Sequence, residues 1–509
     1  MGIPKFFPYL LKNTEGIFRV KDPKTIVKID NLYLDFNGII HNAVKEVFFP
    51  PLKPKRFAPV HNSVKNIEPI KELSKEDKIK KVFKKITESI DNLVKLVEPK
   101  ELLFISIDGT AVVSKQSQQR QRRYKSANLK TDEEIDLFDT NAITPGTKFM
   151  KQLSVYVESF LKKKESEYKI KIIYSGPETS GEGEHLCIDH IRNSNKDKSF
   201  MVYGLDADLF MITMSTHYDK IYLLREDQFC MDTHYYVVNV DTISNQLFKK
   251  YDNVNSKTQF IDDFIFLCFL VGNDFLHNLP AFYNLESSIE LMLNTRKKLG
   301  DIPITNKNFS INMENLLIFF KEIAKMESDL LSSQIEEDRY ENVVLNSSFK
   351  DLNKKELGID LDKFRMGYYK KAKVEDVDSF CRRYIQGLDW VNFYYHNPPK
   401  NWQWLFPYHY SPLICDLVKF LEKNKTIKRM SQVKKSPLTP EQQLLCVIPP
   451  RSKNLLSKKL QEFYTHPELI EYFPETFELD YSGKLKEWEA VALLPFIDLK
   501  KLLKITNLK

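Results

Sequence analysis

Four short apolar runs, separated by helical patterns, organise the first 280 residues of this chain. The runs are "NLYLDF" (31–36), "LLFISID" (102–108), "KIIYSG" (171–176) and "FMVYGLD" (200–206). Each has the length of a strand and is apolar on both faces, which is typical of strands inside a parallel sheet. The helical patterns between them cover roughly 75–98, 145–164 and 182–193. The sequence therefore predicts an α/β fold with a mostly parallel sheet flanked by helices.

Acidic residues stand at the ends of three of these runs. Asp35 ends the first, Asp108 the second and Asp206 the fourth. In open α/β sheets, ligands bind beyond the carboxyl ends of the strands. We therefore expect these three carboxylates to converge at one edge of the sheet.

Four further acids have a related placement. Asp206 and Asp208 are one residue apart, so on an extended chain their side chains would point to the same side. Glu182 and Glu184 have the same spacing in "SGEGEHL", at a glycine-rich turn that opens a helix. Asp274, in "FLVGNDFL", follows an apolar helix and a Gly-Asn turn. All are predicted to face the space beyond the sheet.

Together these residues make a set of seven carboxylates: Asp35, Asp108, Glu182, Glu184, Asp206, Asp208 and Asp274. Two unit charges ~4 Å apart repel by about 1 kcal/mol in water and by more inside a protein. Such a set needs cations, and hard oxygen ligands favour Mg²⁺ or Mn²⁺. Paired metals held by carboxylates serve in-line displacement at phosphorus. Because no Walker A loop or kinase signature accompanies the acids, hydrolysis is favoured.

The alternative is that each acid is a helix cap or a turn residue, which is the better interpretation of any single one. It is a poor interpretation of the whole set, because three acids follow successive strands and two pairs share one spacing.

A basic helical segment, "KQSQQRQRRYK" (115–125), follows Asp108. On a helix, one face carries four donor residues: Lys115, Gln119, Arg122 and Arg123. Arginine forks suit a terminal phosphate, since they offer paired hydrogen bonds. The segment therefore predicts a phosphate anchor, with a solvated basic face as the alternative.

Composition sets broad limits. A chain of 509 residues predicts two or three domains, and a net charge of +7 is too small to indicate a polyanionic partner by itself. Six cysteines without a CxxC pair are typical of reduced thiols in an intracellular protein. The N-terminus lacks the pattern of a signal peptide, and the longest apolar run, "FIFLCFLVG" (264–272), is shorter than a membrane span. A soluble protein is expected.

Strand signals fade after residue 280. Long helical patterns follow, such as the one over 313–333, and an aromatic tract covers 382–413. We therefore expect an α/β domain over 1–280, which carries the acids, and a mainly helical region over 281–509. The Pro- and Lys-rich stretch 48–74 predicts an irregular excursion within the first domain.

Many stretches of the chain carry a family likeness, in order and over nearly its whole length. They include "MGIPKFF", "NLYLDFNGIIHN", "SIDGTA", "KQSQQRQRRY", "FDTNAITPGTKFM", "SGPETSGEGEH", "GLDADLFM", "FLVGNDFLHNLP", "WQWLFPYHYSP", "PLTPEQQLLCVIPP" and "KEWEAVALLPFID". The chain resembles the eukaryotic 5′→3′ exoribonucleases of the Xrn/Rat type. The resemblance implies a PIN- or flap-nuclease-like sheet domain, with the helical region packed on it and shaping an RNA channel.

The resemblance also implies roles for the site residues. The seven acids would hold two Mg²⁺ ions, with Mn²⁺ as a substitute, and the donor face of the basic helix would hold the 5′-monophosphate. His41 and a tryptophan of the "WQW" pair, Trp402 or Trp404, would sandwich the leading bases. The N-terminal segment around 1–7 would help to exclude duplex.

The predicted activity is processive 5′→3′ degradation of single-stranded, 5′-monophosphorylated RNA to nucleoside 5′-monophosphates. Two alternatives stay open, namely a structure-specific flap endonuclease acting on DNA and a catalytically inactive RNA-binding scaffold. Because the chain ends soon after "LLPFID", we expect a minimal catalytic core. We also expect a monomer, an upstream decapping activity that supplies the substrate, and a cytoplasmic location, with a nuclear one as the alternative.

Overall fold

The computed structural model describes most of the chain. The described residues are 6–20, 22–50, 73–227, 234–252, 254–336, 341–349, 358–484 and 486–508. Most of the predicted excursion over 48–74 lies outside them. We use "α/β region" for the described residues up to 252 and "helical region" for those from 254 onward.

Seven strands of the described residues form one sheet, in the order β1-β7-β6-β5-β2-β3-β4. Their bounds are β1 (Ile17–Arg19), β2 (Asn31–Asp35), β3 (Leu102–Ser106), β4 (Lys171–Ser175), β5 (Phe200–Tyr203), β6 (Ile221–Glu226) and β7 (Tyr235–Asn239). Strands β2 to β6 pair in parallel, whereas β7 pairs antiparallel with β6 and with β1. The predicted mostly parallel sheet is confirmed, and its four predicted strands are β2, β3, β4 and β5.

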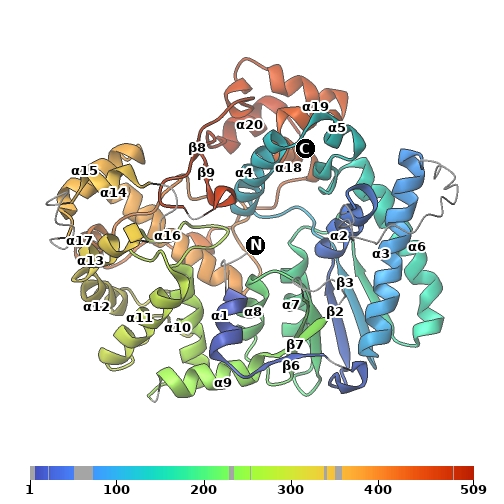
Figure 1. The fold of residues 1–509 in the computed structure, drawn as a ribbon, viewed down its shortest axis with the longest axis horizontal. Coiled ribbons are helices and arrows are strands. Elements are labelled where there is room, and N and C mark those ends of the chain that lie inside the picture. The colour runs from blue at the N-terminus through green and yellow to red at the C-terminus, as the bar shows by residue number, and fades with distance from the viewer. Residues whose placement is uncertain are drawn as a thin grey trace, which may run out of the picture.

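Helices cover both faces of the sheet (Figure 1). One hydrophobic core contains Leu32 and Leu34 of β2 with side chains of α2 (Asn37–Phe48), α3 (Lys75–Val97) and α6 (Lys148–Tyr168). The other core contains Tyr33 of the same strand. Its helices are α1 (Phe6–Asn13), α7 (Gly183–Arg192), α8 (Asp208–Met214) and α9 (Val240–Tyr251). Successive residues of a strand point to opposite faces, so runs that are apolar throughout become strands buried on both sides.

The order of the strands creates a crevice beside β2. This strand lies between β5 and β3, so the chain winds away from it in both directions. The helix after β2 packs on one face of the sheet, and the helix after β5 packs on the other. A switch of this kind opens a space beyond the carboxyl ends of the two strands, where ligands bind in doubly wound sheets.

The helical region packs directly on the sheet domain. Its main helices are α10 (Lys257–Phe269), α11 (Leu285–Lys298), α12 (Met313–Ala324), α13 (Glu327–Ser332), α15 (Leu361–Lys371), α16 (Val377–His396) and α17 (Ile414–Lys423). One continuous hydrophobic cluster includes residues of α1, α7 and α8 together with residues of α10 to α17. The expectation of a mainly helical second part is therefore confirmed, whereas its boundary at residue 280 stays a prediction.

The pattern over 313–333 forms two helices, α12 and α13, rather than one. The second helix begins at Glu327, whose side chain is fully buried. Its carboxylate accepts hydrogen bonds from the backbone amides of Ile414 and Cys415, at 2.7 and 2.8 Å. These amides open α17, so the break between α12 and α13 allows Glu327 to stabilise the N-terminus of another helix.

The last part of the helical region surrounds the basic helix α4 (Val113–Leu129), which lies near the centre of Figure 1. Its elements include α18 (Pro440–Val447), α19 (Lys458–Glu462), α20 (Leu499–Thr506) and a hairpin of β8 (Leu479–Asp480) with β9 (Val491–Ala492). The guanidinium of Arg120 donates to the carbonyls of Tyr472 and Pro495, at 2.5 and 2.7 Å. Helix α4 of the α/β region is therefore also packed against the last part of the helical region.

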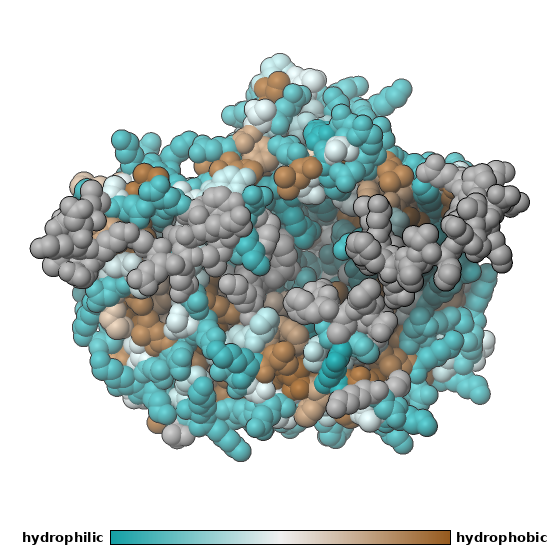
Figure 2. Space-filling model, in the orientation of Figure 1, coloured by the Kyte–Doolittle hydropathy of each residue, from teal (hydrophilic) through white to brown (hydrophobic). Residues whose placement is uncertain are grey.

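The face of the molecule in Figure 2 is largely hydrophilic, with hydrophobic residues in small scattered patches. Among the described residues, no helix combines the length and the apolar character needed to cross a membrane.

Candidate metal and phosphate site

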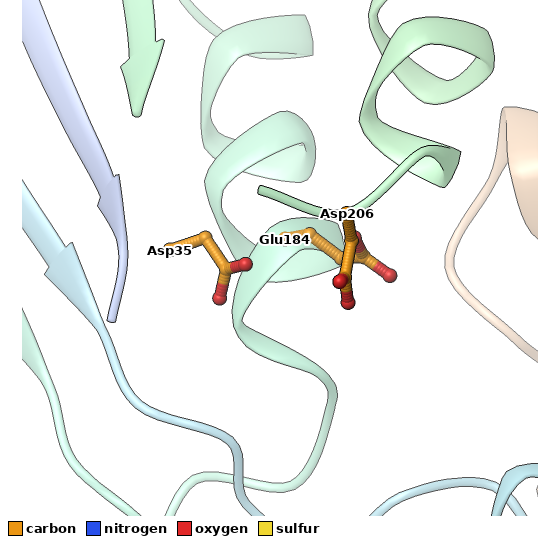
Figure 3. A group of neighbouring side chains, drawn as sticks. All are labelled: Asp35, Glu184 and Asp206. Carbon is orange, nitrogen blue, oxygen red and sulfur yellow. The ribbon is translucent and has the colours of Figure 1, made fainter. Parts of the chain in front are cut away.

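Three carboxylates meet in the crevice beyond β2 and β5. Asp35 is the last residue of β2, Asp206 lies in the loop after β5, and Glu184 lies in the first turn of α7. One oxygen of each lies within 4.8 Å of the others, and Figure 3 shows Asp35 directed toward the other two. Neighbouring parallel strands bring their carboxyl ends together, which explains why residues so distant in sequence meet here.

Asp108 is held beside this group by hydrogen bonds with Gly183 and Asn37. Its carboxylate accepts a hydrogen bond from the Gly183 amide at 2.6 Å and another from the side-chain amide of Asn37. The Asn37 carbonyl oxygen in turn accepts from the Asp108 backbone amide at 3.2 Å. A Cβ atom at position 183 would lie 2.9 Å from the Ser106 carbonyl and 3.0 Å from Asp35 Oδ1. Glycine therefore allows α7 to begin directly against the ends of β2 and β3.

The expectation that Asp206 and Asp208 alternate along an extended chain is wrong. The residue between them, Ala207, is helical (φ −71°, ψ −25°), and Asp208 is the first residue of α8. The turn still leaves Asp208 close to the other acids. Burial, followed by the negative charge of Asp274, raises the pKa of the Asp208 carboxyl to about 7.

The remaining two acids share a lysine. Lys115, at the start of α4, places its ammonium 2.5 Å from Glu182 Oε2 and 2.8 Å from Asp274 Oδ2. Gln118, one turn along, donates to Asp274 Oδ1 at 3.3 Å. Asp274 follows a turn in which Gly272 has a φ of +94°, a conformation that favours glycine. Glu182 precedes α7, yet its side chain does not cap that helix.

The structure thus brings all seven predicted carboxylates into one electrostatically coupled cluster, which we call the acid site. Burial and the neighbouring negative charges raise the pKa values of Asp35 and Glu184 well above their ordinary range. Burial likewise raises the pKa of Asp108 to about 6. Because burial is the largest cause of these rises, the shifts indicate carboxylates that are removed from water and only partly compensated by the Lys115 ammonium.

The donor face of α4 continues away from the acid site. Gln119 is buried, and its side-chain oxygen has no hydrogen-bond partner among the described residues. Arg122 is exposed. Arg123 is buried, and its guanidinium donates to the Thr144 hydroxyl and to Asn141, so it also braces the 141–144 loop against α4.

His41, on α2, lies near this basic face. The pKa of the His41 imidazole is lowered by its partial removal from water and then by the positive charges of Arg122 and Arg123. The residue nevertheless keeps an exposed surface. A neutral, partly open imidazole is suited to stacking on a base.

The two tryptophans of the "WQW" pair differ in their surroundings. Trp404 is 3% exposed and stacks on Trp390 with ring centroids 4.9 Å apart, so its ring belongs to the core. Trp402 is half-buried, and its carbonyl accepts a hydrogen bond from the Val113 amide at the start of α4. Of the two, Trp402 is the one that keeps exposed surface.

The N-terminal segment falls partly outside the described residues, which begin at residue 6. Phe6 and Phe7 belong to α1, and both rings pack against Phe210 of α8. The predicted role of residues 1–7 in excluding duplex stays a prediction.

Sequence reasoning missed three residues that contact the acids: Asn37, Gln118 and Tyr394. Asn37 lies in "NLYLDFNGIIHN", two residues after Asp35, and Gln118 lies in the basic segment "KQSQQRQRRYK". Their position beside predicted site residues is the signal that could have identified them. Tyr394 lies 212 positions from Glu182, to which it donates at 2.9 Å, and no local pattern marks it.

Two family models match the chain. The one described as "XRN 5'-3' exonuclease N-terminus" covers residues 1–227, and the one described as "Xrn1 helical domain" covers 255–358 and 360–508. The chain belongs to the Xrn family. Within this Xrn chain, the acids up to Asp208 fall in the first matched segment and Asp274 falls in the second.

Individual relatives agree with the family assignment. The chain is 26% identical to "5'-3' exoribonuclease 1" of Saccharomyces cerevisiae and 28% identical to the human protein of that name. It is 24% identical to "5'-3' exoribonuclease 2 homolog" of Drosophila melanogaster. Each alignment covers 99% of this chain but 43%, 34% and 70% of the respective relative. The chain therefore spans less than half the length of the yeast and human proteins.

Proposed function

We propose that this Xrn-family chain is a 5′→3′ exoribonuclease that degrades single-stranded, 5′-monophosphorylated RNA processively to nucleoside 5′-monophosphates. The observation that carries the proposal is the convergence of Asp35, Glu184 and Asp206 beside the donor face of α4. The names of the relatives agree with this direction and with RNA as the substrate.

The acid site is the proposed binding site for two Mg²⁺ ions, with Mn²⁺ as a substitute. The clustered acids offer only hard carboxylate oxygens, and two buried ones, Glu184 Oε2 and Asp208 Oδ1, have no hydrogen-bond partner among the described residues. The residues that would hold the ions are Asp35, Asp108, Glu182, Glu184, Asp206, Asp208 and Asp274. Ions bound there would activate a water for in-line attack and stabilise the leaving oxygen.

The basic helix supplies the other half of the proposal. Lys115, Gln119, Arg122 and Arg123 would hold the terminal 5′-phosphate, and Lys115 would also connect that phosphate to the acids, since its ammonium lies beside Glu182 and Asp274. This placement would set the first phosphodiester at a fixed distance from the acid site, so cleavage would release one nucleotide at a time. Phosphate contacts carry no sequence information, so degradation would be largely independent of sequence.

His41 and Trp402 are the proposed stacking pair for the leading bases. Stacking on aromatic faces is tolerant of base identity, because every base has a π-face. It would hold the shortened strand after each cleavage and so support processive movement. The buried Trp404 would support the site from the core instead.

The test compares two single-stranded RNAs that differ only at the 5′ end, one with a monophosphate and one with a hydroxyl, both labelled at the 3′ end. With Mg²⁺, the monophosphorylated RNA should disappear from its 5′ end with release of nucleoside 5′-monophosphates, and the hydroxyl RNA should resist. Asp208→Ala should abolish release while RNA binding survives. Asp219→Ala, which alters an exposed carboxylate, is the matched control.

Other products would favour the alternatives. Short oligomers released from a flapped DNA would indicate a structure-specific endonuclease. RNA binding without any cleavage by the wild type would indicate a scaffold, and equal degradation of the two RNAs would contradict the proposed phosphate pocket.

A further inference from the structure

Two adjacent tyrosines of the helical region reach the acid site. Tyr394 and Tyr395 lie near the C-terminal end of α16, and they are 1% and 0% exposed. The Tyr394 hydroxyl donates to Glu182 Oε1 at 2.9 Å. The Tyr395 hydroxyl is also buried but has no hydrogen-bond partner among the described residues. The two hydroxyl groups thus differ in that only the one of Tyr394 has a hydrogen-bond partner among the described residues.

The hydrogen bond from Tyr394 is one of two contacts that hold the Glu182 carboxylate in place. Its second carboxylate oxygen lies 2.5 Å from the Lys115 ammonium, so both oxygens are held by groups from outside α7. The carboxylate does not cap its own helix, and its side chain is 3% exposed. A carboxylate fixed at both oxygens has one orientation, and here that orientation faces the other acids.

Tyr394 is itself rigidly placed. Its ring stacks on His185 with centroids 3.9 Å apart and planes 13° apart. Trp390, one turn earlier on α16, lies 5.2 Å away, and Phe275 presents its edge at 5.7 Å. His185 follows Glu184 and Phe275 follows Asp274, so the ring contacts two of the chain segments that carry acids. The hydroxyl therefore has no freedom to leave Glu182 without moving those segments.

We infer that Tyr394 is a positioning residue for Glu182, through which the helical region sets the geometry of the acid site. The inference rests on the proposed function in one respect only, namely that these carboxylates bind divalent cations. Groups that hold a metal ligand without touching the metal tune its affinity, and removing one typically costs about 10–100-fold.

The matched variants are Tyr394→Phe and Tyr395→Phe. Each removes one hydroxyl from the same turn of the same helix and keeps the buried ring. The first measurement is Mn²⁺ binding to the RNA-free protein, followed by electron paramagnetic resonance of the free ion. Tyr394→Phe should weaken binding by roughly ten-fold, whereas Tyr395→Phe should stay within about two-fold of wild type.

The second measurement is the dependence of RNA degradation on Mg²⁺. For Tyr394→Phe the half-saturating Mg²⁺ concentration should rise, and saturating Mg²⁺ should restore most of kcat. A variant that merely loosens the fold would lower kcat at all concentrations of Mg²⁺ and would lower the thermal unfolding midpoint.

The inference would be overturned by equal Mn²⁺ affinities for the two variants, or by a wild type that binds no Mn²⁺. Its outcome is separate from that of the proposed function. A wild type that binds Mn²⁺ but releases no mononucleotides would contradict the exonuclease, while the comparison of the two phenylalanine variants would still decide the role of Tyr394.

Discussion

Six of the seven carboxylates of the acid site come from the α/β region, whereas the helical region contributes Asp274 and the hydroxyl that contacts Glu182. The six follow from sheet topology, because strands and helix starts that meet at one edge deliver their side chains to one place. The contribution of the helical region follows from long-range packing of α10 and α16. The first region places most of the acidic groups, and the second restricts how they are oriented.

Two clusters of buried charge in this molecule also differ. In the acid site, seven carboxylates face few cations. In the second cluster, the guanidinium of Arg296 in the helical region contacts Asp252, at the end of the α/β region, and Asp263 and Asp301, at 2.8, 3.1 and 3.4 Å. Asp263 accepts four further hydrogen bonds, from the backbone amides of Ile304 and Thr305, the Thr305 hydroxyl and the Gln259 side-chain amide. We interpret the first cluster as functional and the second as structural.

The largest effect that follows from this comparison concerns Asp35. Asp35→Asn keeps the shape of the side chain but removes a negative charge from the acid site. We expect nuclease activity to fall by about a thousand-fold or more, since metal-assisted charge stabilisation is worth several kcal/mol. The free energy of unfolding should not fall, because the substitution relieves repulsion between buried carboxylates. Mononucleotide release and chemical unfolding are the two measurements.

The control for Asp35→Asn is Asp30→Asn, at the opposite end of the same strand. The Asp30 carboxylate accepts hydrogen bonds from Ser199 and lies away from the acid site. It should lose stability but keep activity within a few-fold. An Asp35→Asn protein that fails to fold would contradict the interpretation that the acid site is functional and the Arg296 cluster structural.

The next largest effect concerns the structural cluster. Arg296→Met leaves three buried carboxylates without their cation, which typically costs about 3–5 kcal/mol. The free energy of unfolding should fall accordingly, while activity per folded molecule at low temperature should stay near that of wild type. Chemical unfolding followed by circular dichroism, together with single-turnover cleavage, measures both.

Lys297→Met is the neighbouring control for Arg296→Met. Lys297 is exposed, so its loss should change the free energy of unfolding little. If Arg296→Met lowered activity without lowering the free energy of unfolding, the interpretation of the Arg296 cluster as purely structural would be wrong.

A pH dependence should follow from Asp263. Burial raises the pKa of its carboxyl to about 6, above a value of about 3.9 in the unfolded chain. The native state then binds more protons than the unfolded state between these values. The contribution to stability is present in full below the unfolded value and is lost as pH rises through about 6, by about 3 kcal/mol at most.

Asp263→Asn removes this titration without changing the size of the side chain. The measurement is the difference between the unfolding free energies of wild type and variant from pH 4 to pH 7. That difference should shrink as pH rises, since only the wild type loses the contribution. A difference that is constant with pH would contradict the assigned titration of Asp263.

The α/β region could be predicted from the sequence because its signals are local. The apolar runs and their spacing identified four strands, and the strand-end acids follow from the direction of those strands. Local turn geometry was less accessible. The alternation expected for Asp206 and Asp208 failed because α8 begins at Asp208, and nothing in "GLDAD" distinguishes a strand end from a helix start.

The contacts of the helical region could not be predicted in this way. The aromatic tract around Trp390, Tyr394 and Trp404 was visible, but its composition does not reveal which ring faces the acids and which faces the core. The break before Glu327 depends on amides about 90 positions away. Such choices are made by tertiary packing, which a single sequence shows only as an apolar or aromatic pattern.

The smallest expected effect concerns an exposed ion pair between the α/β region and the helical region. The ammonium of Lys12, on α1, lies 2.8 Å from the carboxylate of Glu286, on α11, and both side chains are exposed. Lys12→Ala should leave the thermal unfolding midpoint indistinguishable from that of wild type, because solvent and salt screen such pairs. Beneath this pair, Phe6 and Leu10 of α1 belong to the hydrophobic cluster shared with α10 and α11. A clear loss of stability in Lys12→Ala that disappears at high salt would mean that surface charge, and not this shared core, joins the two regions.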